Sequence, residues 1–261
     1  MNLDKWKENK NKWPARKQWL SFLNLISRTE RFTLVFLLLL GTVAGIVWWR
    51  ISYLASTKEI PAEGGTLKEI IVGQPQSLNP LFSPLNEADR DVSELIFAGL
   101  LKYNSDGKVV KDLAKDFKRS KDGLNYEFTL KDNIFWSDGR EITTQDVLFT
   151  MQSIRDPEVQ SPLRIIWQDI KIELKDNKTI KFTLPNAYPP FLENFTVKIL
   201  PYHVFQEVSP QDLILHPPEN LTSSGPFEVK VIEEDEEKNI KKIVLRRNPN
   251  FYGKKTFLEE V

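Results

Sequence analysis

The chain has 261 residues, of which 41% are hydrophobic, and its formal net charge is zero. This length and apolar content fit one large or two small globular domains with a hydrophobic core. The absence of cysteine excludes disulfide bridges, thiolate metal sites, cysteine nucleophiles and a lipid-modified N-terminal cysteine.

Residues 1–31 form a basic head. They carry eight Lys and Arg residues against three acidic residues, which leaves a net charge of −5 for the rest of the chain. An acidic remainder argues against nucleic acid as a partner. Tryptophans and aliphatic side chains alternate with the charges of the head, so two structures are open. The head is either an interfacial helix on the inner leaflet, interrupted at Pro14, or a short solvated tail.

Residues 32–49 form the uncharged apolar run FTLVFLLLLGTVAGIVWW, with arginines on both sides. Eighteen helical residues span about 27 Å, close to the thickness of the hydrocarbon core of a bilayer. The run predicts a transmembrane helix over residues 32–50, in contact with lipid. Because basic flanks stay in the cytoplasm, the N-terminus is expected inside the cytoplasmic membrane. The long head and the two bulky tryptophans favour an uncleaved signal anchor over a cleavable secretory signal.

A tether over residues 51–63 is expected to lead into a domain outside the cytoplasm. The segment LKEIIV at 67–72 predicts a strand, which stops before a proline-rich loop. Residues 89–103 predict a helix, and the segment NSDGK at 104–108 predicts a turn. The apolar face of this helix is formed by Val92, Leu95, Ile96 and Leu100.

Strict alternation of apolar and polar residues predicts three half-buried strands, at 126–130, 170–174 and 180–184. The last two are separated by a short turn and are expected to pair as a hairpin. Between the first strand and this hairpin, residues 144–155 predict a helix, which starts at the capping box 143–146.

Residues 227–232 and 240–246 predict two strands joined by the acidic run 233–237. Five consecutive carboxylates suggest a cation site, but the spacing of a calcium loop is absent, so a solvated hairpin tip is favoured. His203 and His216 do not stand at metal-ligand spacing. No phosphate loop, dinucleotide-binding glycine motif or nucleophile elbow is present. The sequence therefore predicts neither an enzyme nor a metal site nor a cofactor.

Six segments, in order, resemble the extracellular solute-binding proteins of family 5, the peptide- and nickel-binding components of ABC importers. They are GGTLKEIIVGQPQSLNPLF, LIFAGLLKYNSDGKVVKDLAKDF, DGLNYEFTLKDNIFWSDGREITTQDVLFTMQSI, NAYPPFLENF, SSGPFEVK and IVLRRNPNFYG. The resemblance covers residues 64–261 and implies an α/β fold like that of type II periplasmic binding proteins. It implies an incomplete larger lobe over 64–109 and 166–261, with a smaller α/β subdomain inserted over 110–165. Two extended sheets are expected.

The resemblance also implies a function. In this family two lobes close over a solute, and no bond is made or broken. We therefore expect a non-catalytic, membrane-anchored substrate-binding component of an ABC importer, with a peptide or other small solute and the importer's membrane subunits as partners. Carried over by position, the residues expected to line the cleft are Leu81, Phe82, Ser83, Pro84, Leu85, Leu163, Ser223, Ser224, Gly225 and Phe227.

Two of these positions have a second interpretation or depart from the family. Gly225 lacks a side chain, so its backbone could approach a ligand, but a plain turn into the following strand explains it equally well. Leu163 stands where peptide binders of the family often have an aromatic residue, so this position departs from the family's peptide-binding pattern.

The resemblance stops at Val261, where the family's chain crosses into its second large lobe. Either the sequence is a fragment, or a second polypeptide supplies the missing lobe. Two other functions stay open: a truncated or degenerate surface protein with a structural or sensory role, and a membrane-tethered hydrolase. The ligand is also open, since a peptide, a nickel chelate, a sugar or an opine would fit the family.

Overall fold

The computed structural model describes residues 27–57, 62–214 and 221–261. The chain divides into two compact units, Met1–Pro61 and Ala62–Val261, and each is described here by itself. Residues 1–26 of the predicted basic head lie outside the described residues.

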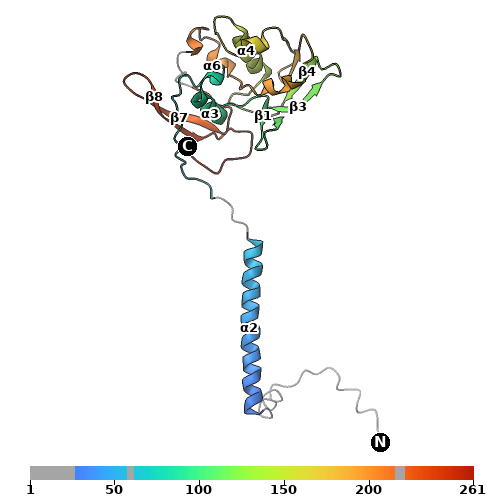
Figure 1. The fold of residues 1–261 in the computed structure, drawn as a ribbon, viewed down its shortest axis with the longest axis vertical. Coiled ribbons are helices and arrows are strands. Elements are labelled where there is room, and N and C mark those ends of the chain that lie inside the picture. The colour runs from blue at the N-terminus through green and yellow to red at the C-terminus, as the bar shows by residue number, and fades with distance from the viewer. Residues whose placement is uncertain (1–26, 58–61, 215–220) are drawn as a thin grey trace. The chain divides into compact units, whose positions relative to one another are not determined.

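The first unit contains one long helix, α2 (Arg28–Ser56), which includes the whole apolar run (Figure 1). It starts at a capping box, in which the Ser27 hydroxyl accepts from the Glu30 amide and the Glu30 carboxylate accepts from the Ser27 amide. The helix is long and apolar enough to cross a membrane, with a mean hydropathy of 2.2 over its most apolar window. The prediction of a helix is confirmed, and its ends extend beyond 32–50.

The second unit is an α/β domain built from short elements (Figure 1). Its helices are α3 (Glu87–Ile96), α4 (Thr144–Arg155), α5 (Arg164–Trp167) and α6 (Tyr202–Phe205), with 3-10 turns η2 (Ser83–Leu85), η3 (Pro189–Thr196) and η4 (Asp212–Ile214). Its strands are β1 (Leu101–Tyr103), β2 (Val109–Lys111), β3 (Ala114–Arg119), β4 (Asn125–Leu130), β5 (Lys171–Leu174), β6 (Thr179–Thr183), β7 (Phe227–Glu234) and β8 (Ile240–Arg247).

An antiparallel four-stranded sheet of order β3-β4-β6-β5 organises one side of the domain. It contains all three strands predicted from alternation, and the β5–β6 hairpin is confirmed. The pairing of β4 with β6 also joins sequence on both sides of residue 165, which was the predicted end of the inserted subdomain. Instead of two extended sheets, the described residues form this sheet and two antiparallel pairs, β1–β2 and β7–β8.

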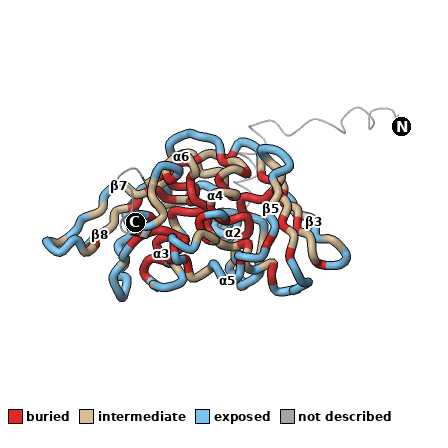
Figure 2. Tube along the Cα trace, turned by 90° about the horizontal axis from the view of Figure 1, so that it is seen from above, coloured by how far each residue is buried: buried red, intermediate tan, exposed pale blue. Residues whose placement is uncertain are grey.

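The core of the domain is rich in aromatic rings. Phe195, on η3, is fully buried and lies at the centre of a ring cluster. Its ring centroid is 4.5 to 5.5 Å from those of Tyr126, Phe128, Trp167, Phe182 and Phe191. These rings come from β4, β6, α5 and η3, so the cluster packs the helical segments against one face of the sheet. Figure 2 shows the buried residues gathered in the middle of the domain, away from the exposed tip of the β7–β8 hairpin.

The prediction of a helix over 89–103 is wrong for its second half. The α3 helix is capped by Asn86 and ends at Ile96, and the chain then turns into β1. The Leu100 carbonyl accepts from the amides of Asp112 and Ala114, which are distant in sequence. Tertiary pairing with 112–114 and with Lys198, which bridges Gly99, therefore replaces the helical hydrogen bonds that the local pattern favoured.

The strand predicted over 67–72 is also absent from the described structure. Only Thr66 makes a bridge, parallel to Glu260, and the Leu67 amide donates to the Glu260 carbonyl at 3.1 Å. A strand needs a partner along its whole length, and within the described residues the backbone of 68–72 makes no hydrogen bond. The β7–β8 hairpin is confirmed, with the Asp235 carboxylate accepting from backbone amides at its tip.

Candidate functional site

The loop before η2 is fixed by one buried carboxylate. Asp89, on the first turn of α3, is 2% exposed. Its Oδ1 accepts from the amides of Gln76, Ser77 and Leu78, at 2.9, 3.3 and 3.1 Å. Three amide donors that would otherwise lack a partner are thus satisfied, and the segment 76–78, which leads into the predicted cleft loop, is held on α3.

Replacing Asp89 with alanine is expected to lower the free energy of unfolding by about 2–4 kcal/mol, because buried amides lose a charged acceptor. Urea titration followed by circular dichroism measures the change. The matched control is Asp91→Ala on the same helix, whose side chain is 55% exposed. A loss at Asp89 no larger than at Asp91 would contradict this role of the carboxylate.

The predicted cleft loop is only partly accessible in the described chain. Leu81 is fully buried and Phe82 is 7% exposed, so both belong to the core. Ser83 is half-buried, Pro84 is exposed, and Leu85 is 71% exposed. The accessible part of the predicted cleft loop is therefore Ser83 to Leu85, on η2.

Leu163 is brought close to this loop by tertiary structure. The Ser161 hydroxyl, two residues away, donates to the Leu81 carbonyl at 2.9 Å. Leu163 itself is partly buried against the core, and the next apolar side chains, Ile165 and Ile166, are exposed. One half of the predicted site is thus a pair of neighbouring segments, 81–85 and 161–163.

The second predicted segment, 223–227, is bonded into the protein. Ser223 and Ser224 are fully buried, and the Ser224 hydroxyl accepts from the Ala98 amide at 2.9 Å. The amides of Ser224 and Gly225 donate to the Ile96 carbonyl, at 3.0 and 2.9 Å. Gly225 therefore allows close approach to the last turn of α3, which is a structural reason for the glycine.

These two halves lie at opposite ends of α3. The η2 turn precedes the helix, whereas 224–225 bind the carbonyl of its last residue. A ten-residue helix is about 15 Å long, so the two halves of the predicted site are separated by roughly the length of α3.

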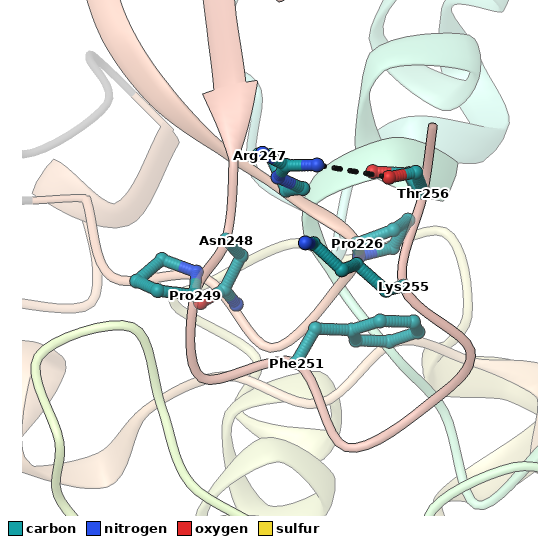
Figure 3. Close-up of a pocket in the computed structure, with 7 residues that line it drawn as sticks. All are labelled: Pro226, Arg247, Asn248, Pro249, Phe251, Lys255 and Thr256. Carbon is teal, nitrogen blue, oxygen red and sulfur yellow. Dashed lines mark hydrogen bonds between the residues drawn. The ribbon is translucent and has the colours of Figure 1, made fainter. Parts of the chain in front are cut away.

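A pocket that the sequence did not predict adjoins the second segment (Figure 3). It has a volume of about 370 Å³ and is lined by Pro226, Arg247, Asn248, Pro249, Phe251, Lys255 and Thr256. The Arg247 guanidinium donates to the Thr256 carbonyl at 3.1 Å, as the dashed line marks. Asn248 holds the loop by donating its side-chain amide to the Gly225 carbonyl.

Two cations give this pocket a positive edge, which one carboxylate partly neutralises. Lys255 Nζ lies 2.7 Å and Arg247 Nη1 3.9 Å from the Glu63 carboxylate. The hydrogen bond and charge of Lys255 lower the pKa of Glu63. Arg247 belongs to the motif IVLRRNPNFYG, but Glu63 precedes Lys255 by 192 residues, so sequence spacing could not bring them together.

Comparison with known proteins decides the family. The model of the bacterial extracellular solute-binding proteins, family 5 (middle), matches residues 108–261, which is more than half of the chain. The chain belongs to this family. The six segments that suggested it from sequence are spread over the same region and the part before it.

Individual relatives agree. DdpA of Escherichia coli (strain K12), described as a probable D,D-dipeptide-binding periplasmic protein, is 30% identical over 203 residues, covering 74% of this chain and 38% of its own length. The structure of the oligopeptide-binding protein AppA from Bacillus subtilis with a nonapeptide gives a TM-score of 0.69 at 26% identity, covering 77% of this chain. NikZ from Campylobacter jejuni with Ni(L-His) gives 0.60 at 26% identity, covering 76%.

The matches cover a larger share of this chain than of its relatives. The chain covers 38 to 40% of the length of these three proteins. The family 5 chain described here therefore corresponds to less than half of each relative.

Proposed function

We propose that the chain is the substrate-binding component of an ABC importer, or the part of one that it spans, and that it binds a peptide or other small solute without catalysis. The observation that carries this proposal is the family match over 108–261. It is supported by three relatives: DdpA, described as a probable D,D-dipeptide-binding protein, AppA in complex with a nonapeptide, and NikZ in complex with Ni(L-His). Among these, peptides are the expected class.

The solute-facing surface is proposed to include the exposed part of η2. Leu85 is 71% exposed although it is apolar, and it follows Pro84 in a turn that comes after the segment 76–78, which Asp89 anchors to α3. The segment 223–227 is proposed to contribute through Pro226 and the pocket beside it, since Ser223 and Ser224 are buried.

Thermal unfolding of the full chain in lipid nanodiscs tests solute binding. The probes are a mixture of peptides of two to nine residues, and Ni(L-His). A ligand at about 100 times its Kd stabilises the folded state by about 2.7 kcal/mol, which raises Tm by several degrees. A melting curve unchanged by millimolar concentrations of every probe would favour the structural or sensory function instead.

Two variants test whether η2 contributes to solute binding. Leu85→Asp is expected to weaken binding of the active probe about fivefold or more, as for a contact worth about 1 kcal/mol. The control Val231→Asp alters an exposed residue of the β7–β8 hairpin and should leave the affinity unchanged. Equal effects of both would remove η2 from the proposed site.

Non-catalytic binding is tested in the same samples. The peptide probes should be recovered at unchanged mass after prolonged incubation. Cleavage that persists in a protease-inhibited, repurified sample would instead support the membrane-tethered hydrolase.

The α2 helix is proposed to anchor the domain in the cytoplasmic membrane as a single span, with the N-terminus inside. The apolar helix and the +5 charge of the head support this topology. Protease added outside intact spheroplasts should then degrade residues 62–261 and leave a membrane-bound fragment. A soluble mature domain in the same cells would show a cleaved signal instead.

A further inference from the structure

The pocket beside Pro226 combines two cations with an apolar wall. Arg247 and Lys255 are its charged lining residues, and no acidic residue of the described chain lines it. Pro226, Pro249 and Phe251 form the apolar wall. Figure 3 shows the two cationic side chains and the Phe251 ring around the same space. A cavity of this composition suits an anion that carries an apolar group.

The Arg247 guanidinium has donors available for a ligand. Its side chain is 23% exposed. Within the part of the chain that the structure describes, the guanidinium makes one hydrogen bond, from Nη1 to the Thr256 carbonyl at 3.1 Å. The Glu63 carboxylate is 3.9 Å from the same nitrogen, which is beyond hydrogen-bond distance. Since a guanidinium has five N–H donors, Arg247 can still bind a carboxylate through two of them.

Glu63 shows that an anion is stable at the edge of this pocket, but it does not fill the pocket. Its Oε2 accepts from Lys255 Nζ at 2.7 Å, although Glu63 is not a lining residue. Both partners are exposed, by 59% for the Glu63 side chain and 60% for that of Lys255. Exposed ion pairs of this kind are weak, so a second carboxylate that reaches both cations can displace Glu63.

The segment that carries Glu63 is held by its backbone rather than by this ion pair. The Gly64 amide donates to the Phe257 carbonyl at 2.8 Å, and the Glu259 amide donates to the Gly65 carbonyl at 3.1 Å. Neither hydrogen bond uses the Glu63 side chain. Displacement of the Glu63 carboxylate therefore leaves the local fold intact.

The apolar wall is preformed. A Cβ atom at Gly253 would lie 2.5 Å from the Phe251 ring, so the glycine lets the ring rest against the backbone. Asn248 is 3% exposed and fixes the loop that contains Pro249. Its side chain donates to the Gly225 carbonyl at 2.9 Å and accepts from the Asn250 amide at 2.9 Å. A preformed wall lowers the entropy cost of ordering the site around a ligand.

We propose that this pocket binds the free carboxylate of a solute that has an apolar group beside it, as at the C-terminus of a peptide ending in an apolar residue. The carboxylate bridges Arg247 and Lys255 and displaces Glu63, while the apolar group contacts the apolar wall. Glu63 is thus an internal competitor for the site. This inference rests on the proposed solute binding and specifies the class of solute.

Calorimetric titration of the full chain in lipid nanodiscs tests the carboxylate site with three probes. They are N-acetylphenylalanine, its amide, and N-acetylglutamate α-amide, whose carboxylate is on the side chain. N-acetylphenylalanine should bind at least tenfold more tightly than its amide, which lacks the charge-assisted hydrogen bonds. Equal affinities of acid and amide, or no binding of either at millimolar concentration, would overturn the proposal. Tighter binding of the glutamate probe would overturn the assignment to a C-terminus.

Matched variants locate the probe. Lys255→Gln should weaken binding of N-acetylphenylalanine at least fivefold, whereas Lys254→Gln removes the same charge outside the lining and should change it less than twofold. Glu63→Gln should tighten binding about threefold or more. Its control is Glu233→Gln, because Glu233 also lies 2.7 Å from an exposed lysine, Lys242. Weaker binding by Glu63→Gln, or a Tm several degrees below that of Glu233→Gln, would make the Glu63 pair structural and overturn the competition.

Thermal unfolding with peptides separates this inference from the proposed function. If a peptide and its C-terminal amide raise Tm equally, solute binding stands and the carboxylate site is wrong. If no peptide raises Tm in either form, the proposed function fails. Titration with N-acetylphenylalanine decides the carboxylate site in both cases.

Discussion

Replacing Phe195 with alanine is expected to lower the free energy of unfolding by about 3–5 kcal/mol, because the change leaves a cavity at the centre of the ring cluster. Phe195 is fully buried, and five aromatic rings surround it, so the cavity cannot be filled by small shifts of flexible side chains. Native domains are stable by about 5–15 kcal/mol, so this substitution removes a large share of the total.

The measurement is urea unfolding of the full chain in detergent, followed by the near-ultraviolet signal of the aromatic cluster. Tyr188→Ala is the matched control, since Tyr188 precedes the same η3 segment and is 56% exposed. A Phe195 variant that loses less than about 1 kcal/mol would mean that η3 does not pack on the sheet as described.

Gly225→Ala is the second substitution with a large expected effect. A Cβ atom at this position would lie 2.5 Å from the Leu95 carbonyl oxygen and 2.7 Å from the Ile96 carbonyl carbon. These are backbone atoms of α3 and cannot rotate away, so the clash must move the helix end or break the hydrogen bonds from Ser224 and Gly225 to Ile96. We expect a loss of about 3 kcal/mol or more, at the upper end for overpacking.

The control is Gly139→Ala, where the added Cβ meets no atom within 4 Å but the backbone has a φ of +87°. That variant should cost only about 1 kcal/mol, from backbone strain. If Gly225→Ala were the milder of the two in thermal unfolding, the close approach of 224–225 to α3 would be incorrect.

Local signals in the sequence determined several elements correctly. The uncharged run predicted the helix that is α2, and the capping box at 143–146 predicted the start of α4. Alternation predicted β4 and the β5–β6 hairpin, because a strand with one buried face needs a period of two. The order of the six motif segments also identified the family, which the match over 108–261 confirms.

Other features depend on partners far away in sequence, and the local patterns gave no information about them. Residues 97–103 have a helical period, but pairing of 99–100 with 112–114 and of 101–103 with β2 makes this stretch extended. Residues 67–72 have the composition of a strand, but within the described residues pairing is confined to Thr66 and Leu67, which contact Glu260.

In the candidate site, too, sequence predicted some residues, whereas tertiary structure decided their surroundings. Their positions in the family motif predicted Ser223, Ser224 and Gly225 as cleft residues. The tertiary structure places this segment against the end of α3, where Ser223 and Ser224 are buried. Glu63, Arg247 and Lys255 meet through the pairing of the domain's first residues with its last ones. The sequence by itself thus determined the family and the elements stabilised by their own neighbours. The tertiary structure decided which segments pair and which side chains stay accessible, because hydrogen bonds and burial between distant segments outweigh local preference.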